Sequence, residues 1–374
     1  MKNRFTLGII IAVLTAGGLV YLFQDRLGGV FGGQTGTSPR PGIQSARSGP
    51  DVSVVAQDLR VPWEMAFLPG GDWLVTERPG TLKRIGANRQ THVVQGVVQT
   101  SEGGLLGLAL HPRFDQNDWL YLYLTSRSGE GLVNRIERYR YDNDELTDRK
   151  LILGDIPGAA NHDGGRLAFG PDGYLYATTG DAGNEMAAQD TASLAGKILR
   201  LNDEGGVPPD NPFGNFVYSY GHRNSQGLAW DDQDRLWSSE HGRSGLRSGF
   251  DELNLISKGA NYGWPLIEGD ETRQGMRRPV IHSGADETWA PAGLVYRNGS
   301  LFFGGLRGQS LYQAKITGQA SVELKAHFSG QFGRLRLSAV GPDGRLYIST
   351  SNTDGRGRPN PGDDKIIRLN LTLF

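Results

Sequence analysis

The most informative stretch of this chain is Gly170-Pro171-Asp172-Gly173-Tyr174-Leu175-Tyr176, which is nearly repeated as Gly341-Pro342-Asp343-Gly344-Arg345-Leu346-Tyr347. The Asp-Gly pair is typical of a tight hairpin turn, because glycine adopts positive φ at little cost. The alternating Leu and Tyr that follow are typical of a strand with one buried face. Each copy therefore predicts a hairpin turn followed by a β-strand.

Four weaker copies of this phrase lie elsewhere in the chain, at residues 68–74, 111–121, 231–237 and 297–302. Six such units, roughly 45 to 65 residues apart, predict an all-β fold, a six-bladed β-propeller of four-stranded antiparallel blades. A β-sandwich, or two of them, would also contain many turns but does not explain the recurring phrase. We expect the propeller to span residues 51–374, with long loops at 181–215 and 261–287.

The composition excludes several classes of function. The formal net charge is −1, which gives no sign of a nucleic-acid partner. The chain contains no cysteine, which excludes disulfides, thiol catalysis, thiolate metal sites and iron–sulfur clusters. Glycine supplies 55 of the 374 residues, as expected for many turns between short strands.

The first 27 residues predict one hydrophobic helix ahead of the propeller. Lys2 and Arg4 precede an uncharged run at 5–23 that nearly spans a bilayer. Because no clear cleavage site follows, an uncleaved signal anchor is favoured over a cleaved signal peptide and over a buried helix. N-terminal sequencing of the mature protein distinguishes the first two.

The charges before this run predict where the protein resides. Lys2 and Arg4 favour a cytoplasmic N-terminus, so the remainder is expected to face the periplasm, tethered to the inner membrane. Cleavage of the segment would instead release the protein into the periplasm. Residues 28–50, rich in Gly, Ser, Pro and Thr, predict a flexible linker between membrane and propeller.

Two histidine-containing stretches predict loops that face a ligand. The first is Asn161-His162-Asp163-Gly164-Gly165-Arg166, whose imidazole is suited to accept a proton from an alcohol because it ordinarily titrates near about pH 6.5. The second is Tyr220-Gly221-His222-Arg223-Asn224-Ser225-Gln226-Gly227-Leu228, in which a cation and two amides suit a planar ligand with several oxygens. Polar side chains that only satisfy the loop backbone are the simpler interpretation of each.

A third set of stretches suits a metal. It combines Ser239-Glu240-His241-Gly242-Arg243, Asp251-Glu252-Leu253-Asn254 and Asn261-Tyr262-Gly263-Trp264-Pro265. Carboxylates, amides and carbonyls near glycines suit Ca²⁺, a hard cation that prefers oxygen, although surface charge on a loop is the simpler alternative. The sequence has no EF-hand spacing, His-Glu-x-x-His, Walker loop, dinucleotide fingerprint or Gly-x-Ser-x-Gly elbow.

Together these stretches resemble the soluble aldose and glucose dehydrogenases that depend on pyrroloquinoline quinone (PQQ), the glucose/sorbosone dehydrogenase family. The resemblance extends from about Val61 to the C-terminus. It also rests on the segments 61–67 (VPWEMAF), 102–112 (EGGLLGLALHP), 196–201 (GKILRL) and 210–213 (DNPF). Each segment is weak evidence alone, but their shared order is specific.

The resemblance implies an enzyme that oxidises the anomeric hydroxyl of an aldose to a lactone. His162 matches the general base, and hydride moves to a quinone that calcium polarises. Arg223 and Asn224 match contacts near the quinone oxygens, where Arg223 stabilises developing charge. Arg334 and Arg336 match the pair that binds cofactor carboxylates, and their alternation places both on one face of a strand.

Further cofactor positions follow from the same resemblance. His241 and Arg307 match cofactor contacts, and Glu102 and Asp163 match positions that line the pocket. Arg307 stands where lysine is common, which retains a cation but changes its hydrogen-bond geometry. Leu337, after Arg336, stands where aspartate is frequent, and both departures bear on cofactor affinity rather than on the fold.

Two calcium sites are also implied. The backbone carbonyls of Gly242 and Arg243 match ligands of the catalytic calcium, which acts as a Lewis acid on the quinone. Glu252 and Tyr262 match a second, structural calcium site. Arg243 stands where proline is common, but a backbone carbonyl ligand survives that change.

Two other classes of function stay open. The first is a calcium-dependent hydrolase of the lactonase type. Against it, four cationic side chains favour an anionic cofactor instead: Arg223, Arg307, Arg334 and Arg336. A non-catalytic propeller that binds a sugar or a partner would have no need for both the base and the arginine pair. The partners expected are an aldose, an external electron acceptor and, through residues 1–27, a membrane.

Overall fold

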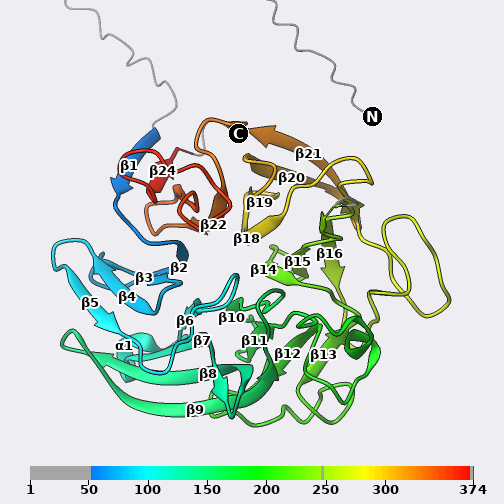
Figure 1. The fold of residues 1–374 in the computed structure, drawn as a ribbon, viewed down its shortest axis with the longest axis horizontal. Helices are drawn as coiled ribbons and strands as arrows, with labels where there is room; N and C mark the ends of the chain where they lie inside the picture. Colours follow the sequence, from blue (N-terminus) through cyan, green and yellow to red (C-terminus); the bar gives the residue numbers. More distant parts are fainter. Residues whose placement is uncertain (1–51, 246–247, 371–373) are drawn as a thin grey trace, which may run out of the picture. The chain divides into compact units, whose positions relative to one another are not determined.

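The computed structural model describes residues 52–245, 248–370 and 374. Its strands form six sheets of four strands each, and neighbouring strands in every sheet are antiparallel. The first strands of adjacent sheets contact one another, so the six sheets surround a common axis (Figure 1). The predicted six-bladed β-propeller is therefore confirmed.

The first three blades consist of consecutive strands. The first blade contains β2 (Pro62–Phe67), β3 (Trp73–Glu77), β4 (Thr81–Ile85) and β5 (Gln90–Val93). The second contains β6 (Leu105–Leu110), β7 (Trp119–Ser128), β8 (Gly131–Asp142) and β9 (Glu145–Pro157). The third contains β10 (Leu167–Phe169), β11 (Leu175–Thr178), β12 (Lys197–Leu201) and β13 (Val217–Tyr220).

The other three blades follow the same order, except at the closure of the ring. The fourth contains β14 (Ser225–Trp230), β15 (Leu236–Glu240), β16 (Glu252–Ile256) and β17 (Ile281–His282). The fifth contains β18 (Pro291–Arg297), β19 (Ser300–Gly305), β20 (Leu311–Gly318) and β21 (Ser321–His327). The sixth contains β22 (Leu335–Val340), β23 (Leu346–Thr350), β24 (Ile366–Leu369) and β1 (Val52–Ala56). Helix is limited to α1 (Phe114–Asn117) and the 3₁₀ helix η1 (Glu185–Gln189) within the described residues.

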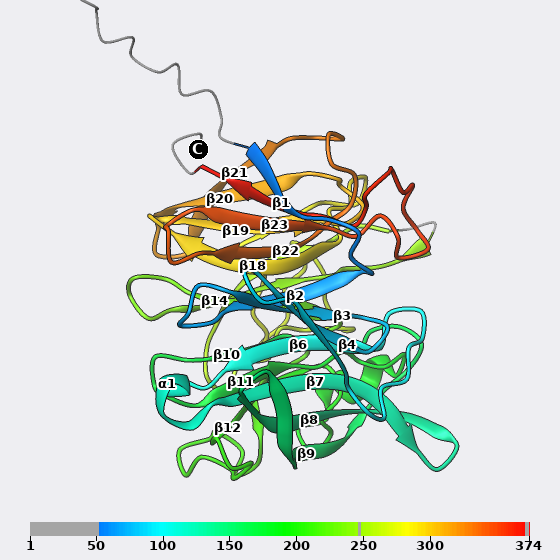
Figure 2. The same cartoon turned by 90° about the vertical axis from the view of Figure 1, so that its left-hand side faces the viewer.

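The sixth blade is closed by strands from both ends of the described chain. β1 pairs with β24, with Val52 opposite Leu369 and Val54 opposite Ile367. The two strands lie side by side in Figures 1 and 2. This pairing joins the two ends of the propeller, so the first and sixth blades become neighbours.

All six copies of the turn phrase connect the first and second strands of a blade. In the fourth blade, Oδ1 of Asp231 accepts the backbone N–H groups of Gln233 and Arg235 at 3.0 and 3.1 Å. Its Oδ2 accepts the indole N–H of Trp237 at 2.8 Å. The same aspartate-to-aromatic bond recurs between Asp172 and Tyr176 and between Asp343 and Tyr347. The aspartate therefore both caps the turn and fixes the first aromatic side chain of the next strand.

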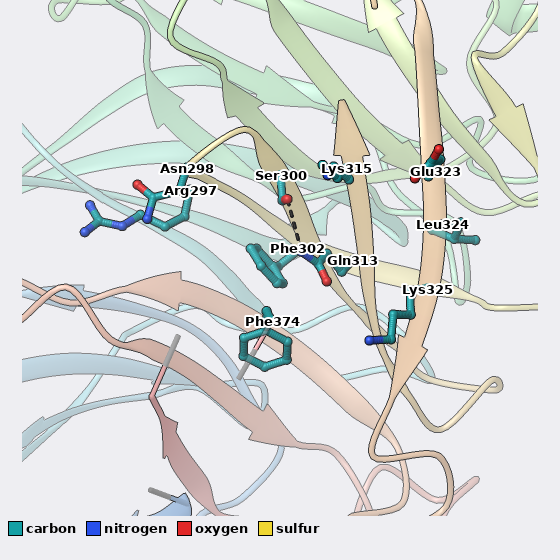
Figure 3. A pocket seen from close by; sticks show the side chains of 10 residues that line it. All are labelled: Arg297, Asn298, Ser300, Phe302, Gln313, Lys315, Glu323, Leu324, Lys325 and Phe374. Atoms are coloured by element: carbon teal, nitrogen blue, oxygen red, sulfur yellow. Dashed lines mark hydrogen bonds between the residues drawn. The ribbon is translucent and has the colours of Figure 1, made fainter. Parts of the chain in front are cut away.

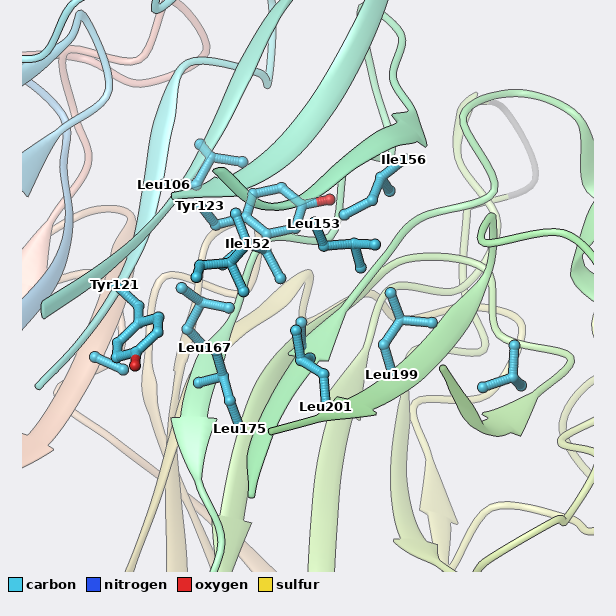
Figure 4. Close-up of a cluster of buried hydrophobic side chains, with 14 of the residues drawn as sticks. Leu106, Tyr121, Tyr123, Ile152, Leu153, Ile156, Leu167, Leu175, Leu199 and Leu201 are labelled. Carbon is cyan, nitrogen blue, oxygen red and sulfur yellow. The ribbon is translucent and has the colours of Figure 1, made fainter. Parts of the chain in front are cut away.

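These aromatic residues also pack between blades. The ring of Tyr347 in the sixth blade lies 5.1 Å from Phe67 in the first, and Tyr176 in the third lies 5.1 Å from Trp230 before the fourth-blade turn. A larger apolar cluster joins the second and third blades, and Figure 4 shows Tyr121 and Tyr123 facing Leu167, Leu175 and their neighbours. The phrase thus recurs because each copy supplies a turn and an inter-blade contact.

The antiparallel blades place the turn phrases at the opposite end from two kinds of loop. The turn between the first and second strands lies at one end of a blade. The loop before the first strand and the loop between the second and third strands lie at the other end. Residues 161–162 and 223–224, predicted above to face a ligand, and 241–243, predicted to hold a metal, all belong to these latter loops.

The two long loops expected between strands both contain short regular elements. The expectation of a long loop at 181–215 is wrong in part, because β12 and η1 lie within this range. The expectation of a long loop at 261–287 is also wrong in part, because this range contains β17. The sequence of β12 alternates little, since all five of its residues are buried. The predicted anchor and linker at 1–50 lie outside the described residues and stay predictions. In the part of the chain that is described, no helix is long and apolar enough to cross a membrane.

The turn aspartate generates a stability prediction. Asp231→Ala should lower the free energy of unfolding by about 2–3 kcal/mol, because the buried indole N–H of Trp237 loses its acceptor together with the turn cap. Gln233→Ala, an exposed position in the same turn, is the control and should change it by less than about 0.5 kcal/mol. Urea and thermal unfolding measure both, and equal effects of the two variants would contradict the role of Asp231.

Candidate active site

A cavity of about 300 Å³ lies at the end of the propeller opposite the turn phrases. Its lining residues all come from loops before a first strand or between a second and a third strand. They include seven of the residues predicted above, namely Glu102, His162, His241, Gly242, Arg243, Arg307 and Arg334. The loops of five blades thus bring distant parts of the sequence to one place.

His162 lies in the loop between β9 and β10, and its side chain is 19% exposed. Its backbone has a φ of 62°, a left-handed conformation that is uncommon for a residue with a side chain. The N–H of His162 donates to Oε2 of Glu102 at 3.0 Å, and Nδ1 lies 2.8 Å from Oδ1 of Asp181. These contacts fix both the backbone and the ring of the predicted base.

Asp181 orients this ring, and the sequence analysis did not identify it. Its buried carboxylate also accepts the N–H of Gly183 at 2.8 Å and the indole N–H of Trp264 at 2.9 Å. Burial raises the pKa of Asp181, but the hydrogen bonds from His162, Gly183 and Trp264 outweigh it and lower the pKa below its usual value. An ionised carboxylate only accepts, so Nδ1 of His162 holds a proton and Nε2 is free to accept one.

The loop that contains Asp181 is anchored by a buried lysine. Lys197 begins β12, and its Nζ donates to the backbone carbonyls of Ala187, Ala188 and Ala195 at 2.8, 3.1 and 2.5 Å. Burial lowers the pKa of Lys197 to about 7. In its ammonium form, Lys197 donates all three protons to one loop and so holds that loop against the third blade.

Arg223 and Asn224 present buried donors that lack partners. Nε and Nη1 of Arg223 and Nδ2 of Asn224 have no acceptor among the described residues. Nη2 of Arg223 donates to Oγ of Ser244 at 3.1 Å, and its guanidinium lies 5.3 Å from the ring centre of Trp264. Buried N–H groups are normally paired, so these donors suit a ligand with acceptor oxygens. Neither residue lines the cavity beside His162, and Arg223 lines the smaller cavity described below.

The other predicted arginines occupy three environments. Arg334 lines the cavity, and its Nε and Nη2 bind Oδ2 of Asp354 at 2.9 and 2.8 Å. Arg307 also lines it, with an exposed side chain. Arg336 is 5% exposed, is absent from the cavity lining, and donates to Oε1 of Gln226 at 3.1 Å. The predicted pair therefore separates into one arginine at the cavity and one deeper in the propeller.

A further guanidinium, that of Arg356, was not predicted. Its Nη1 donates to Oε1 of Glu102 at 2.7 Å, and its Nη2 donates to Ser101 and Asn161 at 3.1 and 3.2 Å. Burial raises the pKa of Glu102, but the N–H of His162 and the guanidinium of Arg356 lower it to about 2. Glu102 therefore lines the cavity as an ionised group with both oxygens bonded to protein.

Asp163 and His241 differ in their access to the cavity. Oδ1 of Asp163 accepts from Asn134 at 2.9 Å and from the N–H of Ala159 at 3.1 Å, and burial raises the pKa of Asp163 to about 6. Asp163 is absent from the lining, although the sequence placed it there. His241 lines the cavity, its buried Nε2 has no partner in the described part of the chain, and burial lowers its pKa to about 4. His241 is therefore a neutral ring at neutral pH.

The predicted metal positions surround a second, smaller cavity. Its lining includes Gly242, Arg243, Glu252 and Tyr262. Glu240 lies opposite Glu252 in the pairing of β15 with β16. Burial and the charge of Glu240 raise the pKa of Glu252 to about 8. A cation would stabilise the ionised form of this carboxylate, so the residues present fit one.

Backbone carbonyls would have to complete any metal site. Within the described residues, no three His, Asp or Glu side chains converge as a metal site. The carbonyl of Arg243 accepts the N–H of Gly249 at 3.2 Å and retains a second lone pair. The hydroxyl of Tyr262 already bonds Leu255 and Ser257, which leaves the backbone of Tyr262 to contact a metal.

Comparison with known proteins places the chain in a family. Residues 59–367 match the model of the glucose/sorbosone dehydrogenases. The chain belongs to the glucose/sorbosone dehydrogenase family. This match confirms the predicted family. It also confirms the general prediction of a PQQ-dependent sugar dehydrogenase, without its detailed chemistry.

Three relatives illustrate the similarity of this sugar dehydrogenase to named proteins. The aldose sugar dehydrogenase YliI of Escherichia coli is 32% identical, over 82% of this chain and 91% of its own length. Quinoprotein glucose dehydrogenase B of Acinetobacter calcoaceticus is 33% identical, over 64% of this chain and 57% of its own length. The PQQ-bound aldose sugar dehydrogenase of Streptomyces coelicolor is 43% identical, with a TM-score of 0.79 over 86% of this chain and 98% of that one.

A larger groove elsewhere on this sugar dehydrogenase does not contain the site. It measures about 540 Å³ and lies on the fifth blade, where Figure 3 shows Arg297, Lys315, Lys325 and Phe374 around it. None of the residues that line the cavity beside His162 belongs to this groove. Chemistry rather than size therefore identifies the candidate active-site cavity.

The contact between Asp181 and His162 generates a kinetic prediction. Asp181→Asn should lower kcat for sugar oxidation by about 10²- to 10⁴-fold, because an amide does not fix the proton on Nδ1 or stabilise a protonated ring. Steady-state kinetics with an aldose and an artificial acceptor measure the effect. Glu185→Gln, an exposed change in the same loop, is the control. A wild-type kcat for Asp181→Asn would show that Asp181 does not orient the base.

Proposed function

We propose that this protein oxidises the anomeric hydroxyl of an aldose to the corresponding lactone, with bound PQQ and Ca²⁺ and an external electron acceptor. The central observation is the pair of His162 and Asp181, which opens onto a cavity surrounded by guanidinium groups. The names of the relatives, an aldose sugar dehydrogenase and a quinoprotein glucose dehydrogenase, support this proposal.

The donors of the site fit the acceptors of PQQ. PQQ is a planar quinone with three carboxylates, so it offers mainly hydrogen-bond acceptors and negative charge. Arg307 and Arg334 line the cavity and are assigned to its carboxylates. Arg223 and Asn224, whose buried donors lack partners among the described residues, are assigned to its quinone oxygens. His241 supplies a further nitrogen, Nε2, that has no partner among the described residues.

The protein residues account for the proton that sugar oxidation releases. Bound PQQ supplies the two-electron chemistry. Nε2 of His162 accepts the proton of the anomeric hydroxyl, because Nδ1 is committed to Asp181. The ionised carboxylate of Asp181 then stabilises the charged imidazole. The buried guanidinium of Arg223 stabilises negative charge that develops beside it in a site of low dielectric.

Calcium completes the proposal at two places. The carbonyls of Gly242 and Arg243 would hold one ion at the wall shared by the two cavities. Glu252 and the backbone of Tyr262 would hold the second, where a cation offsets the repulsion between Glu252 and Glu240. Oxygen ligands of this kind suit Ca²⁺.

Reconstitution tests the function directly. Full-length protein stripped of metal with a chelator should oxidise aldoses only after both PQQ and Ca²⁺ are added, as measured with a sugar panel and an artificial electron acceptor. His162→Ala should lower kcat by about 10²- to 10⁴-fold, because the base is lost, while PQQ still binds. His92→Ala, on β5 of the first blade, is the control.

Each alternative outcome has a distinct meaning. Unchanged oxidation by His162→Ala would exclude His162 as the base. Lactone hydrolysis that survives complete removal of PQQ would favour the calcium-dependent hydrolase. A protein with neither activity nor a spectral change on addition of PQQ would overturn the proposal.

Calcium binding generates a separate prediction. Calcium at about 100 times its dissociation constant should stabilise the PQQ-free protein by about 2.7 kcal/mol per site. Glu252→Gln should abolish much of the calcium-dependent rise in the thermal midpoint, because it removes the charge that binds the ion. Calorimetry with chelator, Ca²⁺ or Mg²⁺ measures this rise, and the exposed change Glu323→Gln is the control. A full rise in Glu252→Gln would exclude Glu252 as a ligand.

A further inference from the structure

Arg356 connects two parts of the propeller that are far apart in the sequence. It lies in the loop between β23 and β24 of the sixth blade, whereas its partner Glu102 precedes β6 of the second blade, 254 residues away. Its Nη2 also reaches Ser101 and Asn161, on either side of β6–β9. The side chain is 51% exposed, yet three acceptors hold it in one orientation.

Glu102 transmits this contact to the backbone of His162. Oε1 of Glu102 accepts from Arg356, and Oε2 accepts the N–H of His162 at 3.0 Å. His162 has a φ of 62°, which a residue with a side chain seldom adopts without support. On the other side of His162, Gly180 is so close that a Cβ there would lie 1.8 Å from the carbonyl oxygen of His162. The left-handed backbone is therefore held from two sides.

The same loop is tied to the predicted cofactor site. Oδ1 of Asp354 accepts the N–H of Arg356 at 2.9 Å, and Oδ2 binds Nε and Nη2 of Arg334. The carbonyl of Asp354 also accepts Nη2 of Arg78 at 3.2 Å. Buried contacts of Asp354 therefore fix the backbone of Arg356, although the guanidinium of Arg356 is exposed.

We propose that Arg356 is a positioning residue that, through Glu102, holds His162 in the left-handed conformation in which its imidazole faces the cavity. This inference rests on the proposed function, since it concerns the base of that reaction. An isolated exposed ion pair contributes little to stability, so the main effect of this one is geometric. A shift of about 1 Å in a catalytic group can lower a rate by about 10²-fold.

Arg356→Met in the full-length, reconstituted enzyme tests this role. We expect kcat at saturating PQQ and sugar to fall by about 10- to 100-fold, with the Kd for PQQ and the KM for sugar changed by less than about threefold. Arg356→Lys, which can still reach Glu102 with a cation, should recover part of the loss. Arg358→Met, an exposed arginine in the same loop, is the matched control.

A second measurement does not depend on activity. The chain has 7 histidines, so ¹⁵N-histidine labelling gives a spectrum in which His162 can be assigned with His162→Gln. In the PQQ-free protein, Arg356→Met and Glu102→Ala should both shift the His162 ring resonances, and Arg358→Met should not. Binding of PQQ is titrated separately by tryptophan fluorescence.

The outcomes separate this inference from the proposed function. Wild-type kcat and an unchanged His162 spectrum in Arg356→Met would overturn the positioning role. Weaker PQQ binding with a normal kcat at saturation would also overturn it, and would assign Arg356 to the cofactor instead. If Arg356→Met does not fold, Arg356→Lys and Glu102→Gln provide the same comparison. A wild-type enzyme without PQQ-dependent activity would refute the proposed function, while the PQQ-free spectra would still test the inference.

Discussion

The candidate active site depends on the pairing of β1 with β24, because this contact closes the ring of blades. Closure brings the first strands of all six blades around one axis, and only then do the loops of five blades converge. Arg356 and Glu102 illustrate this dependence, since they meet from the sixth and second blades although the whole first blade separates them along the ring. In an open ring, neither His162 nor Arg334 would face a shared cavity.

The turn phrase made the fold predictable, because its information is local. A carboxylate that caps a turn and binds an aromatic residue a few positions later needs no distant partner, as Asp231 and Trp237 show. The loop position of His162 was predictable for a similar reason, since its glycine-rich neighbourhood predicts a loop, whereas its role as a base was implied only by the resemblance. β12 was missed because all of its residues are buried, which removes the alternation on which strand prediction depends. The resemblance to a family supplied Arg334, and it assigned individual residues within stretches whose composition already suited a metal.

Asp181 and Arg356 could not be predicted in the same way, because their roles arise from contacts between blades. Asp181 follows a second strand, and nothing in its neighbours indicates that His162 lies within hydrogen-bond distance. Arg356 lies in a polar segment in which Arg358 is an equally plausible arginine from sequence alone. The distinction is made by Asp354, which fixes the backbone of Arg356 and so directs it toward Glu102.

Asp354 also explains how the site can be cationic and still ordered. It lies among Arg78, Arg334 and Arg356, and burial raises its pKa while Arg334 and Arg336 lower it below its usual value. Asp354 carries one negative charge, whereas Arg78, Arg334 and Arg336 carry three positive charges around it, so a positive potential remains for an anionic cofactor, while the charge of Arg356 is paired with Glu102. At the same time Asp354 holds Arg334 in place before a ligand arrives, which reduces the conformational entropy lost on binding. Because the same carboxylate fixes the loop of Arg356, the contacts that order Arg334 extend through Arg356 and Glu102 to His162, so the proposed cofactor site and the proposed base share one structural support.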